Sequence, residues 1–243
     1  MNKIARIFFV VGMIVLAPTL PSWSPAGTNA PSLTGSWHWQ KGSIENSICF
    51  IDDYCAFVSF DKEHKKFNYT WGGPYQVKGD NIFVQLQFNT QQKELVGTAF
   101  SFNYKWQNDL LLADFGGQQQ EWKQVDGGKA PLAGVWRISG RKQGDNMSEI
   151  QLGARRTLKI LTGSRFQWAA INIETKEFFG TGGGAYSFEN GKYTEHIEFF
   201  SRDSSRVGSS LSFDGKLENG AWHHSGLSSR GEPIYEIWSR LNK

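Results

Sequence analysis

Three of the five histidines in this 243-residue chain lie in its second half, at His196, His223 and His224. Two imidazoles and a carboxylate from Glu195 or Glu198 are adequate zinc ligands. The H-x-x-x-H and H-E-x-x-H spacings of helical zinc sites are absent from the sequence, however. The same side chains can instead anchor the polar group of a ligand, or form hydrogen bonds within a sheet. We therefore assign no metal site and keep these two roles as alternatives.

Patterns that support catalysis are scarce in the sequence. A Gly-x-Ser-x-Gly elbow, which would present a serine nucleophile, is missing. Glu195 and Glu198 project from opposite faces of a strand, so they cannot act together as the two carboxylates of a glycosidase. His196 with Glu198 as an acid–base pair is the enzymatic alternative. We predict a non-catalytic protein that needs no cofactor.

The glycine run Gly180–Gly184 has the composition of a phosphate-binding loop. Such a loop requires a following helix whose amide groups point at the phosphate. Here Tyr186, Phe188 and an Asn190-Gly191 turn follow, which is typical of a strand and a hairpin. The run therefore predicts a bulge or a tight crossover at the rim of a sheet.

The chain contains an internal duplication. The L-x-G-x-W motif of residues 33–37 returns at residues 132–136, and Gly72–Tyr75 returns at Gly183–Tyr186. Matching Phe67–Tyr69 with Phe166–Trp168 places about a dozen extra residues of the second half after Trp168. We divide the chain into residues 27–126, a linker at 127–131, and residues 132–243.

Strand patterns dominate both halves. Residues 156–162 alternate as Thr157, Lys159 and Leu161 against Leu158 and Ile160. Asn-Gly pairs at 190–191 and 219–220 predict two-residue hairpins. About eight strands per half with short turns favour an all-β fold of two tandem antiparallel up-and-down barrels. Open sheets, or one larger sheet spanning both halves, are the alternatives.

The second half resembles the lipocalin-like domains of secreted bacterial proteins, within the calycin superfamily. The resemblance rests on the opening Gly134-x-Trp136 and on residues 180–184, 193–199, 222–224 and 236–240. It implies that Trp136 closes one end of the barrel and that Arg240 packs across its ring. The first half keeps a structural tryptophan, Trp37, but Gln124 stands at the position that matches Arg240, with Lys123 beside it. Closure of the first barrel must therefore differ, or the resemblance is looser there.

The first 26 residues predict a signal peptide that is cleaved on export. Lys3 and Arg6 precede an apolar run at residues 7–16, and Ser24-Pro25-Ala26 offers a cleavage site. An uncleaved anchor helix is the alternative. An oxidising compartment and the short spacing of Cys49 and Cys55 predict a disulfide across a hairpin, contributing about 2 kcal/mol. We expect a periplasmic or secreted protein.

The charge pattern argues against a nucleic-acid partner. The chain has 26 Lys and Arg against 23 Asp and Glu, and these are interspersed without a basic run. No segment of the mature sequence is apolar enough to span a membrane as a helix. Small molecules remain as the expected partner class.

These observations predict an exported protein that binds a small apolar or aromatic ligand, mainly in the second barrel. An envelope domain with filled barrels that binds protein or polysaccharide is the alternative. The predicted ligand-binding residues are Arg156, Trp168, Tyr186, His196, Trp222, His224 and Glu236.

Overall fold

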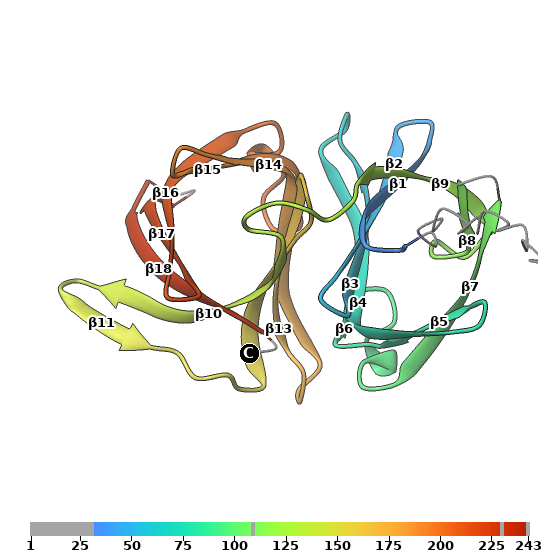
Figure 1. Ribbon diagram of the computed structural model, residues 1–243, viewed down its shortest axis with the longest axis horizontal. Helices are drawn as coiled ribbons and strands as arrows, with labels where there is room; N and C mark the ends of the chain where they lie inside the picture. The colour runs from blue at the N-terminus through green and yellow to red at the C-terminus, as the bar shows by residue number, and fades with distance from the viewer. Residues whose placement is uncertain (1–31, 108–109, 229–230, 242–243) are drawn as a thin grey trace, which may run out of the picture. The chain divides into compact units, whose positions relative to one another are not determined.

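The predicted all-β fold of two barrels is confirmed. The computed structural model describes residues 32–107, 110–228 and 231–241, and the signal peptide predicted for residues 1–26 lies outside them. The structure is 67% strand and 3% helix and forms two closed, antiparallel, eight-stranded barrels in tandem (Figure 1).

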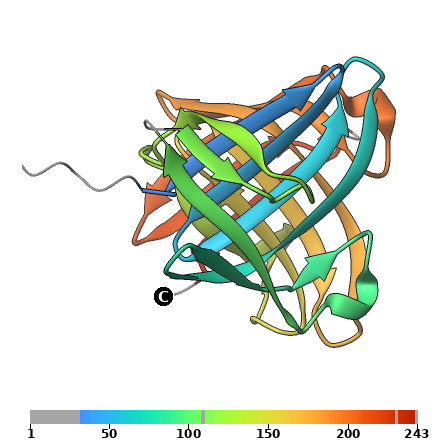
Figure 2. The ribbon, with the colours of Figure 1, turned by 90° about the vertical axis from the view of Figure 1, so that its right-hand side faces the viewer.

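The first half contributes nine strands. They are β1 (Gly35–Lys41), β2 (Ile44–Ile51), β3 (Tyr54–Asp61), β4 (Lys66–Lys78), β5 (Asn81–Gln85), β6 (Phe88–Asn89), β7 (Ala99–Gln107), β8 (Leu110–Ala113) and β9 (Gln120–Asp126). The ring runs through β1–β5 and β7–β9, and pairing of β9 with β1 and of β3 with β4 closes it. The two-residue β6 pairs with β4. Figure 2 shows these strands crossing the barrel obliquely.

The second half also contributes nine strands. They are β10 (Gly134–Gln143), β11 (Asn146–Glu149), β12 (Arg155–Leu161), β13 (Arg165–Asn172), β14 (Glu177–Glu189), β15 (Lys192–Phe200), β16 (Ser210–Glu218), β17 (Ala221–Leu227) and β18 (Pro233–Arg240). Pairing of β10 with β18 closes the second ring, and β11 forms a hairpin with β10 outside it. Closure of both rings excludes the open-sheet alternatives.

The strand registers relate the two barrels residue by residue. Trp37 pairs with Ile48 in the first barrel, as Trp136 pairs with Lys159 in the second. The match of Phe67–Tyr69 with Phe166–Trp168 is wrong, because Trp168 takes the position of Phe57. The extra dozen residues therefore lie between β10 and β12, where they form the β11 hairpin, and not after Trp168.

The Asn-Gly turns form as predicted. Asn190 and Asn219 have φ of 50°, and the glycines that follow have φ of 75° and 77°. Two consecutive residues in this region give the turn that matches the twist of a hairpin. The sequence signal therefore sets the β14–β15 and β16–β17 registers locally.

The predicted disulfide is wrong, and both cysteines are free and buried. Asp52 and Asp53 form a two-residue turn with φ of 49° and 57°, so Cys49 pairs with Ala56 and Cys55 pairs with Phe50. Cross-strand partners share a face, and neighbouring positions do not. Cys55 consequently points into the first barrel, and Cys49 points outward.

The glycine run forms a bulge, as one of the two predicted alternatives. It lies within the long strand β14, where the register with β15 shifts between Gly183 and Gly184. Gly184 has φ of 152°, and a Cβ atom there would lie 2.1 Å from the carbonyl oxygen of His196. Only glycine allows this approach, which bends the strand around the barrel.

A tryptophan lies at the same end of each barrel interior. The indole N–H groups of Trp37 and Trp136 each donate to a carbonyl oxygen four residues earlier, at 2.8 Å. The Arg240 guanidinium carbon lies 3.9 Å from the centroid of the Trp136 ring, which is the contact that the resemblance implies. Gln124 instead donates to the Thr34 carbonyl oxygen.

The barrels pack through an apolar cluster formed by their outer faces. The first barrel supplies residues of β2, β3 and β6, and the second supplies residues of β10, β12 and β13. The buried members are Cys49, Ile51, Tyr54, Ala56, Phe88, Val135, Leu158, Ile160, Ala169 and Ile171. One face of β12 is therefore buried although it lies outside its own barrel.

Helical structure within the described ranges is limited to 3-10 turns at Lys93–Leu95 and Ser204–Arg206. Neither has the length or hydrophobicity needed to cross a membrane.

Candidate functional site

A pocket of about 330 Å³ opens into the second barrel. Its apolar wall comes from β13, β15, β16 and β18 and includes Trp168, Phe200, Leu211 and Ile234. Polar and charged side chains on β10, β12, β15, β17 and β18 line the rest, namely Arg141, Lys159, Glu195, His224 and Glu236. The pocket thus combines an apolar surface with convergent polar groups, as small-molecule sites do.

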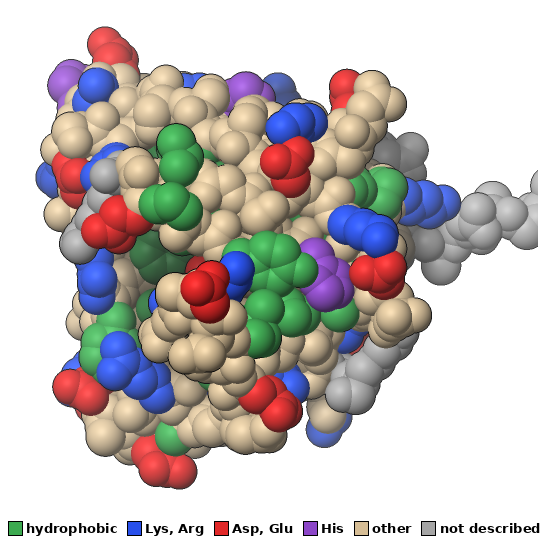
Figure 3. All heavy atoms as spheres, turned by 90° about the vertical axis from the view of Figure 1, so that its left-hand side faces the viewer, with side chains coloured by type: hydrophobic (Ala, Val, Ile, Leu, Met, Phe, Trp, Pro, Cys, Tyr) green, Lys and Arg blue, Asp and Glu red, His purple; other side chains and the backbone are tan. Residues whose placement is uncertain are grey.

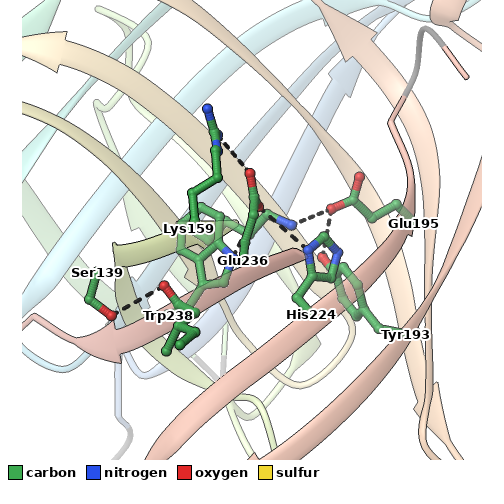
Figure 4. A network of polar contacts seen from close by, with 9 residues as sticks. Ser139, Lys159, Tyr193, Glu195, His224, Glu236 and Trp238 are labelled. Carbon is green, nitrogen blue, oxygen red and sulfur yellow. Dashed lines mark hydrogen bonds and ion pairs between the residues drawn. The ribbon is translucent and has the colours of Figure 1, made fainter. Parts of the chain in front are cut away.

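Lys159 lies inside the barrel with only 6% of its surface exposed. Its Nζ atom lies 2.7 Å from Glu195 Oε1 (Figure 4). The same atom lies 4.8 to 5.2 Å from the ring centroids of Tyr193, Trp222 and Trp238. Glu195 Oε1 also accepts a 3.0 Å hydrogen bond from the Tyr193 hydroxyl. A carboxylate and several aromatic rings therefore compensate for the burial of the ammonium group.

Glu236 is the second buried carboxylate. Arg141 lies 2.7 Å from its Oε1 atom, and the Trp238 indole N–H donates to Oε2 at 3.2 Å. Burial alone raises the pKa of a carboxyl group, but His224, Lys159 and Arg141 outweigh burial here. Together they lower the pKa of Glu236 from 4.5 to about 2. Glu236 is therefore ionised at neutral pH.

His224 lies between these groups and is only 2% exposed. Its Nδ1 atom is 3.5 Å from Glu236 Oε2. Burial, and then the charge of Lys159, lower its pKa below 6.5, although Glu236 acts in the opposite direction. The imidazole is therefore neutral at neutral pH.

Two buried polar side chains lack hydrogen-bond partners within the described structure. These are both ring nitrogens of His224 and the indole nitrogen of Trp222. The 3.5 Å approach of His224 to Glu236 is an electrostatic contact at the limit of hydrogen-bonding distance. Unpaired buried polar groups are costly and rare in native proteins. The His224 nitrogens, which belong to a residue that lines the pocket, are therefore candidates for contact with a bound molecule or water.

The first barrel lacks the charged interior. The registers place Ile48, Val84, Ala113 and Gln120 where the second barrel has Lys159, Glu195, His224 and Glu236, respectively. The first barrel nevertheless closes with the same strand order. The charged cluster is therefore not a requirement of the fold.

The first barrel has its own pocket, of about 320 Å³. Tyr69, Trp71, Phe102 and Phe115 line it, and among its lining residues Asp114 is the charged one. Two of these rings, Trp71 and Phe102, stack with centroids 4.6 Å apart, so each covers a face of the other. The two pockets are similar in volume and differ in chemistry.

Three predicted ligand-binding residues line the second-barrel pocket: Trp168, His224 and Glu236. Tyr186 and Trp222 also point into the barrel, but they belong to its packed core. The Tyr186 hydroxyl donates to the Thr162 carbonyl oxygen at 2.7 Å. These two residues are therefore part of the packed core and do not line the pocket.

Two predicted ligand-binding residues point away from the pocket. Arg156 shares the outer face of β12 with Leu158 and Ile160, and its Nε atom donates to the Gly153 carbonyl oxygen. His196 is exposed, with its Nδ1 atom 2.8 Å from the Ser210 hydroxyl oxygen. Both predictions are wrong because each strand faces inward through the alternate set of residues.

Lys159 and Glu195 line the pocket but were absent from the predicted ligand-binding residues, although Glu195 was considered as a possible metal ligand. For Glu195 a signal existed, because Tyr193 and Ile197 occupy the same face of β15 and are apolar. For Lys159 the signal was misleading, because its apolar neighbours Leu158 and Ile160 suggested the opposite face.

The fold does not bring together the residues of the alternative metal site or of the alternative acid–base pair. His196 and His224 lie outside and inside the barrel, so they cannot share a metal ion. Across the described residues, no cluster of three or more potential metal ligands is found. Glu198 contacts Arg165 and Lys62, while His196 contacts Ser210. Each member of the proposed acid–base pair is thus engaged elsewhere.

The outer surface over the second barrel is unremarkable in charge. In Figure 3, acidic and basic side chains are interspersed on this face, with small groups of hydrophobic side chains between them. This face carries no extended basic surface of the kind that binds nucleic acids.

Comparison with known proteins identifies a family match for the second half of the chain, and that family has no described activity. Residues 131–243 match a family model described as "Domain of unknown function (DUF4488)". The match covers the second barrel. No curated protein matches the chain.

Proposed function

We propose that this protein is a non-catalytic binding protein that holds a small apolar or aromatic ligand in its second barrel. The apolar wall around Trp168 would contact the body of the ligand, and His224 with its neighbours would contact a polar group. We further propose that it is an exported, lipocalin-like protein. The closed eight-stranded barrel, the stacking of Arg240 on Trp136 and the composition of residues 1–26 support this proposal.

The difference between the two barrel interiors carries the proposal. Lys159, Glu195, His224 and Glu236 are buried together, whereas the equivalent residues of the first barrel bear no charge. Burying charged groups generally costs stability, and replacing a buried ion pair by apolar residues is often neutral or stabilising. Since the fold forms without these charges, their presence beside a pocket favours a binding role.

A pair of histidine variants tests the site. N-phenyl-1-naphthylamine, an uncharged aromatic dye that fluoresces in apolar surroundings, serves as the probe. We expect saturable binding at one site per chain. His224→Ala, which changes the pocket, should weaken binding by about tenfold, equivalent to the loss of about 1.4 kcal/mol. His196→Ala, which changes the exposed face of β15, should bind the dye normally.

Thermal unfolding of both variants shows whether the barrel is intact. Equal dye affinity of His224→Ala and the wild type would contradict the pocket assignment. Native mass spectrometry of the protein from its own host provides an independent test, since a retained small molecule is expected. Failure to bind the dye, together with the absence of any retained molecule, would favour a protein or polysaccharide partner.

A further inference from the structure

The hydrogen-bonding capacity of His224 indicates which polar group the pocket accepts. Its Nδ1 atom faces the ionised Glu236 at 3.5 Å. A neutral imidazole carries one proton, and this carboxylate favours that proton on Nδ1. Nε2 is then a buried acceptor without a partner in the described structure. It requires a donor, and a bound molecule can supply one.

Glu195 offers a second acceptor at the same pocket. Both of its hydrogen bonds, from Lys159 and from Tyr193, end on Oε1. Its Oε2 atom receives no hydrogen bond within the described structure. The Lys159 ammonium, by contrast, is held by Glu195 and by the surrounding aromatic rings. The unpartnered indole N–H of Trp222 is a donor of the packed core and does not line the pocket. Among the described residues that line the pocket, the buried atom left without a partner is the acceptor His224 Nε2.

The charges that line the pocket are already paired. Lys159 is paired with Glu195, and Arg141 is paired with Glu236. A ligand carboxylate would add a negative charge beside two carboxylates, and a ligand ammonium would add a positive charge beside Lys159. Either addition leaves an unbalanced charge in a poorly solvated site, which is costly. An uncharged donor leaves the balance intact.

We propose that the second-barrel pocket selects ligands with an apolar body and an uncharged hydroxyl group, which donates to His224 Nε2 or Glu195 Oε2. This inference rests on the proposed function and adds the chemistry of the ligand's polar end. Its basis is the unpartnered ring nitrogen of a side chain that is 2% exposed, at a pocket whose charged groups are paired.

A series of naphthalene probes that differ in one substituent tests this selection. The probes are 2-naphthylmethanol, 2-methylnaphthalene, 2-(methoxymethyl)naphthalene, 2-naphthoate and 2-naphthylmethylammonium. Displacement of N-phenyl-1-naphthylamine measures the affinity of each. We expect the alcohol to bind about tenfold more tightly than the hydrocarbon, the effect of one well-made hydrogen bond. The ether, the acid and the amine should also bind more weakly than the alcohol.

The His224→Phe variant keeps a ring in the same position and removes the acceptor. It should reduce the preference for the alcohol over the hydrocarbon, measured as the ratio of the two affinities in the same variant. The ether comparison uses only the wild-type protein and tests donation directly, even if this variant does not fold.

The outcomes separate this inference from the proposed function. If the dye and the hydrocarbon bind but the alcohol has no advantage over hydrocarbon or ether, the hydroxyl selection is wrong and the pocket remains. Tightest binding of 2-naphthoate would also overturn the selection and would indicate that Arg141 exchanges Glu236 for the ligand. If neither the dye nor any probe binds, the proposed function itself fails.

Discussion

At the scale of single residues, the second barrel concentrates charge where the first has none. Lys159 occupies the position of Ile48, and Glu195 occupies that of Val84. Such groups remain ionised inside a protein only when partners replace the water they lose. Lys159, Glu195 and the aromatic rings around them lie on four strands, β12, β15, β17 and β18. The site therefore exists only when the barrel is closed.

Acid should destabilise this site through Glu236. Its pKa is 4.5 in the unfolded chain and about 2 in the fold. Its stabilisation is therefore complete above pH 4.5 and is lost as the pH falls from there toward 2. The difference corresponds to about 3 kcal/mol at neutral pH. His224 acts in the same direction, because its lowered pKa makes the unfolded chain take up the proton first as the pH falls below 6.5.

Urea unfolding at a series of pH values measures this loss of folding stability in acid. The Glu236→Gln variant should be less stable than the wild type at pH 7 and should show a flatter decline between pH 4.5 and 2. Glu121→Gln is the matched control, since Glu121 is an exposed carboxylate on the last strand of the first barrel. Parallel curves of stability against pH for Glu236→Gln and the wild type would contradict the attribution of the acid sensitivity to Glu236.

At the scale of elements, turn length decides which residues meet. The two-residue Asp52-Asp53 turn pairs Cys49 with Ala56 and leaves Cys55 on the opposite face of the hairpin. A turn with one more residue would change the register and the faces that meet. Short sequence spacing between cysteines is therefore insufficient to predict a disulfide in a hairpin.

The two thiols should be free in the purified protein. A reductant is expected to leave the unfolding temperature unchanged. Alkylation in denaturant without reductant should add two adducts, as measured by intact mass. Native protein should react slowly, because both side chains are buried and burial raises the pKa of Cys49 to about 12. Adducts that appear only after reduction would show that the two cysteines form a disulfide.

At the scale of the whole molecule, the barrels share a polar contact as well as an apolar one. Asp126, at the end of β9, accepts hydrogen bonds from Thr162, Gly163 and Ser164 of the second barrel. It also accepts hydrogen bonds from Ser36 and Gly128. A second link joins Gln167 to Thr70 at 2.8 Å. These hydrogen bonds connect residues of the first barrel directly to residues of the second.

Asp126→Ala should therefore destabilise both barrels together. Six hydrogen-bond donors from five residues lose their acceptor carboxylate, and the expected cost is at least about 2 kcal/mol. Differential scanning calorimetry should show one transition in the wild type and an earlier one in the variant. Asp145→Ala, at a fully exposed position, should leave the transition unchanged. Separate transitions for the two barrels in the wild type would show that they unfold independently.

Much of the architecture was predictable from local signals. The Asn-Gly turns, the repeated L-x-G-x-W motif and the alternating strands predicted two antiparallel barrels. The contact between Trp136 and Arg240 was implied by the family resemblance alone. Three of the pocket residues, Trp168, His224 and Glu236, were also found. These features depend on turn geometry and on strand periodicity, which act over a few residues.

The sequence alone determined which segments form strands and where they turn, because those choices are local. Only the tertiary structure decided which face of β12 looks inward. Leu158 and Ile160 have the character of an interior face, yet they pack against the first barrel. Their burial there leaves Arg156 outside and directs Lys159 into the second barrel, where Glu195 compensates its charge. Alternation defines two faces of a strand, but contact with a distant segment determines what each face meets.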